Sequence, residues 1–478
     1  MMKVYNSLTF QMEEFKTIHP NEVLMYVCGP TVYDSPHLGH AKSAVAFDVI
    51  RRYLEFKGYH IKVVKNYTDI DDKIIKRANE KGIDFETLSE QHIEEYERIM
   101  KSLNLKPDEV NPRATEIIDY MIEVIESLIN KGYAYESNGS VYFSVRSYEG
   151  YEEIFQNIKK GEDEEEYEIP EEEEPLYGDK YDPKDFVLWK AWKEGEPYWE
   201  SPWGRGRPGW HIECSCMAIK YLGDVIDVHG GGLDLKAPHH KNEIVQTTAY
   251  TGKQRFANYF FHNGFVKIDD EKMSKSLGNF FLVSEILEKF DPMVVRFFLI
   301  SSHYRRSINF TLDNMKQSEK NYNKLINTIR RIDTTETIEN GSSEVQELLK
   351  MVEETEGRII DAMDEDFNTP EAIAEILALF KDLNRIIFEE KTKITEDFKD
   401  AFFNFISDLD SILGIFPKLK KKLKLGIAGS IDEKDELIKN LINIIRDTRE
   451  ALRERKLYDL SDNIRDKLRE LNINVEDK

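Results

Sequence analysis

Two short segments of this chain hold residues suited to phosphate chemistry. They are residues 36–40 (PHLGH) and residues 272–276 (KMSKS). His37 and His40 can donate hydrogen bonds to oxygens whose charge grows as an α-phosphate is displaced, and Gly39 lets the backbone approach a nucleotide. We assign Lys275 to transition-state charge and Lys272 to positioning its loop. Either segment alone is as often an ordinary surface turn or loop, but the two together indicate ATP chemistry.

The pattern around the first segment is that of a parallel sheet. Residues 23–28 are an apolar run typical of a buried strand, and apolar spacing predicts a helix over 41–57 and a second strand over 60–67. Strand, helix, strand is the βαβ unit. The HLGH segment then lies between a strand and a helix, where doubly wound sheets bind nucleotides.

The whole chain predicts an α/β fold with a split Rossmann-like parallel sheet and an inserted domain, followed by an all-α helical bundle. Further helices are expected at 70–81, 86–103, 114–131, 211–221 and 238–250, with strands at 140–145, 225–229 and 258–262. The bundle helices are expected at 311–331, 344–364, 368–389, 396–413, 433–455 and 459–471. The predicted parts are 1–132 and 209–262 for the two halves of the sheet domain, 133–208 for the insert, 263–310 for a linker domain carrying KMSKS, and 311–478 for the bundle.

A glycine run follows the predicted strand at 225–229. Gly230, Gly231 and Gly232 are expected to form a turn on which an adenine or ribose can lie, with Asp234 accepting hydrogen bonds from ribose hydroxyls. An ordinary tight turn explains the run about as well.

Four residues offer zinc-like ligand types. Cys28 ends the first strand, Cys214 stands on the opening turns of a helix, and His239 and Glu243, four apart, share a helix face. Pro238 suits the first position of that helix. By chemistry alone, Cys216 could replace Cys214 as a ligand. The spacing of these residues is not that of a zinc finger. Cysteines packed on a helix face and a histidine that caps a helix are the commoner explanation of such residues.

Bulk properties bound the class of protein. The chain has 478 residues, 40% of them hydrophobic, so several domains are expected. No apolar stretch reaches the roughly 18 residues that span a bilayer, and no signal-peptide pattern opens the chain. Three cysteines do not make a disulfide framework. We therefore expect no membrane and a cytoplasmic location.

The charge is strongly acidic. A net charge of −24 argues against a nucleic-acid partner, which usually requires a basic surface. Local runs differ, because residues 418–424 hold five lysines and residues 161–175 hold ten acids. A solvated surface loop is the commoner explanation of both runs, and an acidic loop can also repel RNA from the wrong face.

Longer motif strings point to a family. They are residues 26–34 (YVCGPTVYD), 66–73 (NYTDIDDK), 185–190 (DFVLWK) and 201–204 (SPWG), the last running on to Cys214. With HLGH and KMSKS, the chain resembles class I aminoacyl-tRNA synthetases. Over roughly residues 20–315 it closely resembles the cysteinyl-tRNA synthetase family, with a looser helical match to the end.

The resemblance implies a zinc ion bound by two cysteines, a histidine and a glutamate, which the substrate thiolate joins. In this sequence those ligands are Cys28, Cys214, His239 and Glu243. Cys216 is then a packing residue, and Thr68 and Trp210 lie around the amino acid. Zinc can separate cysteine from its near-isostere serine, because a soft thiolate binds it far better than a hydroxyl does. The resemblance implies no editing domain.

The implied reaction has two steps. Cysteine attacks the α-phosphate of Mg-ATP to give cysteinyl-adenylate and pyrophosphate, and the terminal ribose hydroxyl of tRNA(Cys) then takes the cysteinyl group. Positioning and charge stabilisation supply the rate. Expected cofactors are one Zn²⁺ per subunit and Mg²⁺ with ATP; expected partners are L-cysteine, ATP and tRNA(Cys), and the chain is expected to be a monomer.

The resemblance also implies roles for the last two parts of the chain. The linker domain contacts the tRNA stem and the bundle contacts the anticodon. Some family members continue into a small mixed domain that touches the anticodon, and this chain is expected to lack it. Anticodon reading then rests on the bundle, with the lysines of 418–424, and is less strict. The acidic run 161–175 has no expected counterpart in the family.

Two rival functions remain open at this point. An ATP-dependent cysteine ligase with a small amino-sugar acceptor would keep every site named above, although it has no need of a long helical bundle. A non-enzymatic RNA-binding or regulatory protein on a synthetase fold would have lost active-site lysines or ligands, and here all of them remain.

Overall fold

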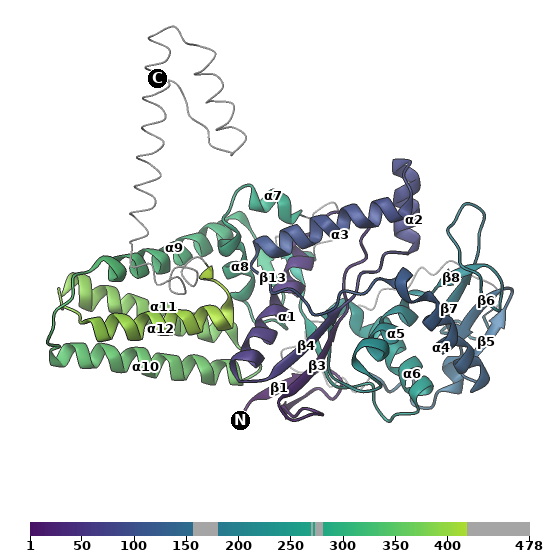
Figure 1. Cartoon of the computed structure of the whole chain (residues 1–478), viewed down its shortest axis with the longest axis horizontal. Coiled ribbons are helices and arrows are strands. Elements are labelled where there is room, and N and C mark those ends of the chain that lie inside the picture. Colours follow the sequence, from purple (N-terminus) through teal and green to yellow (C-terminus); the bar gives the residue numbers. More distant parts are fainter. Residues whose placement is uncertain (156–179, 269–270, 273–280, 418–478) are drawn as a thin grey trace, which may run out of the picture.

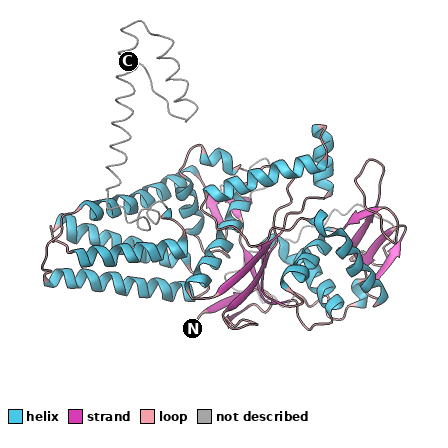
Figure 2. Ribbon diagram, viewed as in Figure 1, coloured by secondary structure: helices cyan, strands magenta, loops and turns pink. Residues whose placement is uncertain are grey.

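A computed structural model describes residues 1–155, 180–268, 271–272 and 281–417. Figure 1 shows three parts in a row: a bundle of long helices, a central sheet with its helices, and a smaller insert at the other end. Figure 2 shows strands only in the central part and in the insert. The predicted architecture of a split parallel sheet, an insert and a helical bundle is confirmed.

The central sheet has four strands, which run parallel. They are β3 (Glu22–Val27), β4 (His60–Lys65), β9 (Ile226–Gly232) and β10 (Ala257–Asn263), in the order β10-β9-β3-β4. Residues 23–27 are all buried, as expected of a parallel strand covered on both faces. The chain winds from β3 to one side and from β9 to the other, so the carboxyl ends of these two strands mark the switch point where such sheets bind ligands.

Helices cover both faces of this sheet. Helix α1 (Leu38–Phe56) packs on one face and α5 (Trp210–Leu222) on the other, and the same part of the chain also contains α2 (Asp72–Lys81), α3 (Phe85–Ser102), α4 (Ile118–Asn130) and α6 (Lys241–Thr251). Helix α1 begins earlier than the predicted 41–57, because His37 acts as its N-cap and the HLGH segment forms its first turn. Nearly all of α1 is buried, so it crosses the core rather than lying on it.

The insert is a small antiparallel sheet. Its strands β5 (Ala134–Ser137), β6 (Ser140–Phe143), β7 (Phe186–Ala191) and β8 (Gly206–Pro208) pair in chain order. Lys190 of β7 and Arg207 of β8 both contact Asp72 at the start of α2. Burial would raise the pKa of Asp72, but these two cations lower it to about 2. The acidic run 161–175 lies outside the described residues.

The linker part contains a three-stranded sheet and two helices. The strands are β11 (Val266–Ile268), β12 (Glu271–Lys272) and β13 (Ile308–Phe310), and the helices are α7 (Val283–Leu287) and α8 (Pro292–Ile300). The bundle consists of α9 (Leu312–Thr334), α10 (Ser343–Asp364), α11 (Thr369–Leu383) and α12 (Glu396–Leu413). These match four predicted helices, and the helices expected at 433–455 and 459–471 lie outside the described residues, as do the lysines of 418–424.

Three local features differ from the sequence predictions. A hairpin of β1 (Lys3–Asn6) and β2 (Gln11–Glu14) opens the chain, which its weak alternation did not predict. The glycine run continues β9 instead of forming a turn, since Gly230 and Gly231 pair with β10. Helix α6 starts at Lys241 rather than at Pro238, because Ala237 is non-helical and residues 236–240 form a separate turn.

Among the described residues, no helix combines the length and the hydropathy that crossing a bilayer requires.

Candidate active site

Two thiols, an imidazole and a carboxylate converge at the carboxyl end of β3. Cys28 follows β3, Cys214 lies in the second turn of α5, His239 in the turn before α6, and Glu243 in the first turn of α6. Their ligand atoms all lie within 4.8 Å of one another. His239 Nε2 is 2.9 Å from Glu243 Oε1, so the two side chains meet as predicted, although His239 lies in the turn before α6 and not on the helix itself. Cys28 Sγ is 3.5 Å from Glu243 Oε1 and 3.7 Å from His239 Nε2.

The electrostatics of this cluster fit a metal ion. A hydrogen bond from Cys28 lowers the pKa of Cys214 to about 6, although burial opposes the shift. Burial would lower the pKa of His239, but Glu243 and Cys214 raise it to about 10. The nearest partner of the Glu243 Oε2 atom is His229 Nε2 at 3.4 Å, a contact that falls short of hydrogen-bond geometry. Buried thiolate, carboxylate and imidazole donors at this spacing can hold a metal ion.

Other histidines surround the cluster, and the sequence patterns did not single them out. His229 and His240 form a second four-atom set with Cys28 and Glu243, also within 4.8 Å. His229 Nε2 lies 3.4 Å from Glu243 Oε2, and His240 Nδ1 lies 2.8 Å from His262 Nε2. One signal in the sequence could have found His229. It lies near the carboxyl end of the predicted strand that became β9, and this strand pairs with β3, which Cys28 follows.

A cavity of about 350 Å³ opens beside Cys28. Seven of the predicted site residues line it: Cys28, His37, Gly39, His40, Trp210, Gly232 and Asp234. The sequence did not predict several others, including Thr31, Tyr33, Ser43, Lys65, Lys73, Tyr96 and Asn263. The Trp210 ring stacks on the His239 ring, with centroids 4.2 Å apart, so the metal-like cluster and the cavity share a wall.

The HLGH segment presents the start of α1 to this cavity. The rings of His37 and His40 stack with centroids 3.7 Å apart. The backbone N–H of His37 donates to Nδ1 of His40 at 3.2 Å. Because Nδ1 accepts, the proton of the neutral His40 ring is on Nε2, which makes Nε2 a hydrogen-bond donor. A helix N-terminus with a donor imidazole is suited to phosphate oxygens.

The chain segments on either side of KMSKS are held against α1. The backbone N–H of Leu38 donates to the carbonyl of Phe281 at 3.2 Å, and the N–H of Val283 donates to the carbonyl of Pro36 at 3.0 Å. On the other side, Lys42 of α1 donates to the carbonyl groups of Phe265 and Arg306, next to β11 and β13. Lys272 belongs to β12 through its backbone pairing with Lys267. Lys275 lies outside the described residues.

Among the described residues, three that were predicted to contact the nucleotide or the cysteine do not line the cavity. Thr68 is buried and donates to Glu213 Oε2 at 2.9 Å, and its backbone bridges Thr31, which does line the cavity. Gly230 and Gly231 lie behind the wall, where a Cβ on Gly230 would fall 2.3 Å from the Phe47 ring. Glycine at this point serves the close packing of β9 on α1.

We expect Gly29→Ala to destabilise the site. A Cβ on Gly29 would lie 1.6 Å from the carbonyl oxygen of Asn66, a backbone atom that cannot rotate away. The strand end that carries Cys28 must then shift, so we expect a loss of about 1–3 kcal/mol in the free energy of unfolding, as for other overpacked sites, and a reduced metal content. Chemical denaturation and metal analysis measure the two effects.

Gly357→Ala is the matched control, because a Cβ there meets nothing within 4 Å in a helix. It should stabilise α10 by roughly 0.5–1 kcal/mol. Equal denaturation curves for Gly29→Ala and the natural protein would contradict this packing.

Comparison with known proteins agrees with this geometry. The family model described as the class I (C) tRNA synthetase catalytic domain matches residues 14–320, and the DALR domain matches residues 358–417. The cysteine–tRNA ligase of Fusobacterium nucleatum is 44% identical, with 100% of this chain and 98% of the relative covered. That of Thermococcus gammatolerans is also 44% identical, covering 100% and 97%.

A distant solved structure shows the same fold. Methionyl-tRNA synthetase of Mycobacterium tuberculosis, in complex with methionyl-adenylate, superposes with a TM-score of 0.62 at 14% identity, covering 84% of this chain and 93% of that one. At this identity the likeness concerns the fold alone. The identity of 44% over the whole chain and the match to the catalytic-domain model together show the family. The chain belongs to the cysteine–tRNA ligases, within the class I aminoacyl-tRNA synthetases.

Proposed function

We propose that this protein is a cysteine–tRNA ligase that activates L-cysteine with ATP and transfers it to the 3′ end of tRNA(Cys). One observation carries the proposal. A buried cluster of two thiols, an imidazole and a carboxylate shares a wall with a cavity that receives the N-terminus of the HLGH helix. That arrangement supports the recognition of a thiol beside a site for phosphate.

Zinc is the metal that the donor set suits best, held by Cys28, Cys214, His239 and Glu243. When bound, zinc supplies a soft Lewis acid that prefers the thiolate of cysteine to the hydroxyl of serine. Trp210 closes the pocket on the side of His239. Thr68 acts through its hydrogen bond to Glu213 and its bridge to Thr31, which positions the cavity wall.

The nucleotide occupies the part of the cavity near α1. His37 and His40 donate to phosphate oxygens, Gly39 and Gly232 allow close approach, and Asp234 accepts from the ribose. Gly230 and Gly231 lie behind this part of the cavity wall and allow the strand to pack closely there. Lys272 and Lys275 bring positive charge to the triphosphate of Mg-ATP, and their loop is anchored to α1 at both described ends. No side chain serves as a covalent nucleophile, so positioning and charge supply the rate.

The remaining parts bind tRNA. The linker around β11–β13 contacts the acceptor stem, and the bundle from residue 311 onward contacts the anticodon arm. The domain divisions after residues 132, 208, 262 and 310 belong to the same proposal, as do a monomeric state and a cytoplasmic location.

The decisive experiment charges tRNA with labelled cysteine and ATP, with serine as the control. We expect cysteine-specific, tRNA-dependent product and cysteine-dependent pyrophosphate exchange. Exchange without charging of tRNA(Cys) would shift the acceptor to a small amine such as an amino sugar. If the protein shows neither charging nor exchange, the proposal is wrong.

A further inference from the structure

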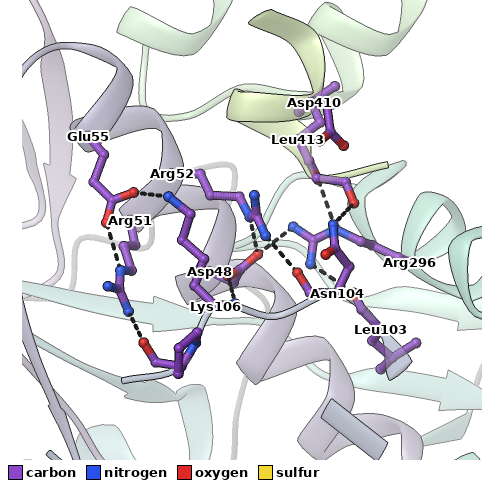
Figure 3. Close-up of polar contacts among 12 residues, drawn as sticks. Asp48, Arg51, Arg52, Glu55, Leu103, Asn104, Lys106, Arg296, Asp410 and Leu413 are labelled. Atoms are coloured by element: carbon purple, nitrogen blue, oxygen red, sulfur yellow. Dashed lines mark hydrogen bonds and ion pairs between the residues drawn. The ribbon is translucent and has the colours of Figure 1, made fainter. Parts of the chain in front are cut away.

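A buried ion cluster joins the HLGH helix to the helical bundle (Figure 3). We propose that Arg296 of α8 is a positioning residue: it fixes the end of bundle helix α12 against α1 and so sets where a tRNA held by the bundle presents its terminal nucleotide. The inference rests on the proposed function, because it concerns the transfer step of that reaction.

Asp48 of α1 is the centre of the cluster. Its Oδ2 accepts from Arg52 Nε at 2.7 Å and also from the guanidinium of Arg296. Its Oδ1 accepts from the backbone N–H of Lys106 at 2.8 Å. Burial would raise the pKa of Asp48, but Arg296 and Arg52 hold it below its usual range. The carboxylate is therefore charged and shared between two arginines.

Arg296 reaches three other parts of the chain from α8. Besides Asp48, its Nε donates to the carbonyl of Leu413, the last residue of α12, at 2.8 Å. Its Nη1 donates to the carbonyl of Leu103, just after α3, at 3.1 Å. The side chain is fully buried. Only a planar guanidinium offers donors in these several directions at once, so lysine cannot replace it.

A second path closes the cluster into a ring. Arg52 donates to the carbonyl of Asn104 at 2.6 Å, and the Asn104 amide donates to the carbonyl of Gly414 at 2.8 Å. Gly414 ends α12 with φ +67°. A Cβ there would lie 2.7 Å from Nη2 of Arg296 and 2.9 Å from Cζ of Arg52. The end of α12 therefore sits directly on both guanidinium groups.

The same helix carries the active-site histidines and this joint. Asp48 follows His40 by eight residues, which is about 12 Å along a helix axis. Further along α1, Tyr53 donates to Asp364 at the end of α10 at 2.6 Å. One buried helix thus connects the nucleotide pocket with two bundle helices. Adenylate formation needs only the nucleotide pocket, whereas transfer to tRNA needs the bundle held at a fixed position relative to that pocket.

The test compares Arg296→Lys with the natural enzyme in both half-reactions. We expect pyrophosphate exchange within about twofold of normal, and a KM for tRNA(Cys) raised by about tenfold or more during charging. Lysine keeps the charge opposite Asp48 but loses the bonds to Leu413 and Leu103. Arg205→Lys is the control, since Arg205 lies in the insert, where its guanidinium pairs with Glu200 at 3.0 Å rather than with α1 or the bundle. It should leave both activities unchanged.

Two results would overturn the inference. One is a normal KM for tRNA(Cys) in charging by Arg296→Lys. The other is an equal loss of pyrophosphate exchange and of charging, which is what a merely structural role would produce. If Arg296→Lys does not fold, Asn104→Gly keeps the backbone conformation and removes only the bond to Gly414. It should still raise the KM for tRNA by about threefold at normal exchange, and no change would reject the inference. A natural enzyme that neither exchanges nor charges would instead reject the proposed function.

Discussion

Cys214→Ser is expected to yield a folded protein without stoichiometric zinc, whose affinity for cysteine falls by at least about a hundredfold. Even the outer partners of a metal site contribute roughly 10- to 100-fold to affinity or activity, and a direct ligand should contribute no less. A serine hydroxyl is a poor ligand where a thiolate stood. The buried Glu243 and His239 would lose the shared cation that their geometry suits. ATP binding near α1 should persist, since no atom of Cys214 lines that cavity.

Metal analysis and a fluorescence titration with cysteine measure these effects. Trp210 reports on the site directly, because its ring stacks on that of His239. Cys216→Ser is the control, two residues along the same helix: Cys216 is fully buried but belongs to neither of the ligand sets among the described residues. It should keep zinc and cysteine affinity at some cost in stability. Retained zinc and normal cysteine affinity in Cys214→Ser would remove this residue as a ligand.

His40→Asn is expected to slow adenylate formation by about 100- to 1000-fold, the usual effect of losing one donor to developing negative charge. The ring of His40 accepts the backbone N–H of His37 through Nδ1, which leaves Nε2–H as the donor. Asparagine has a shorter reach and cannot keep both bonds. Lys275→Ala should act in the same direction and to a similar extent, because both groups act on the same phosphate charge.

Single-turnover formation of the adenylate is the measurement. Zinc content and cysteine affinity should stay normal in both variants, since His40 belongs to neither ligand set of the described residues and a lysine is not a zinc-like ligand type. His60→Asn, at the exposed start of β4, is the histidine control and should behave as the natural protein. A near-normal adenylation rate in His40→Asn or in Lys275→Ala would take away the role assigned to that residue.

Much of the fold was predictable because helix and strand patterns are local. The amphipathic spacing over residues 311–413 predicted four bundle helices that the structure contains, and the apolar run at 23–28 predicted β3. Errors occurred where tertiary packing outweighs local preference. The glycines at 230 and 231 look like a turn in sequence, yet they extend β9 by pairing with β10. They are glycines because neighbouring side chains leave no room for a Cβ, that of Phe47 at Gly230 and those of Leu235 and His240 at Gly231.

The site was predictable in its residue types but not in its surroundings. Cys28, Cys214, His239 and Glu243 have the chemistry of zinc ligands and match a family motif, so the sequence could nominate them. Their meeting depends on the pairing of β3 with β9, two strands about 200 residues apart. The connection from β9 to α6 folds back so that His229 lies 3.4 Å from Glu243, a contact that no local pattern indicates.

The sequence by itself indicated the class of reaction and nominated the residues for it, since short motifs that resemble those of a family are properties of residue type and spacing. Only the tertiary structure decided how the catalytic half is tied to the bundle. Arg296 stands in an apolar helix as a lone charge, and its partner Asp48 lies 248 residues away. Burial makes that pairing obligatory, because an arginine removed from water must find acceptors, and only the folded chain specifies which ones.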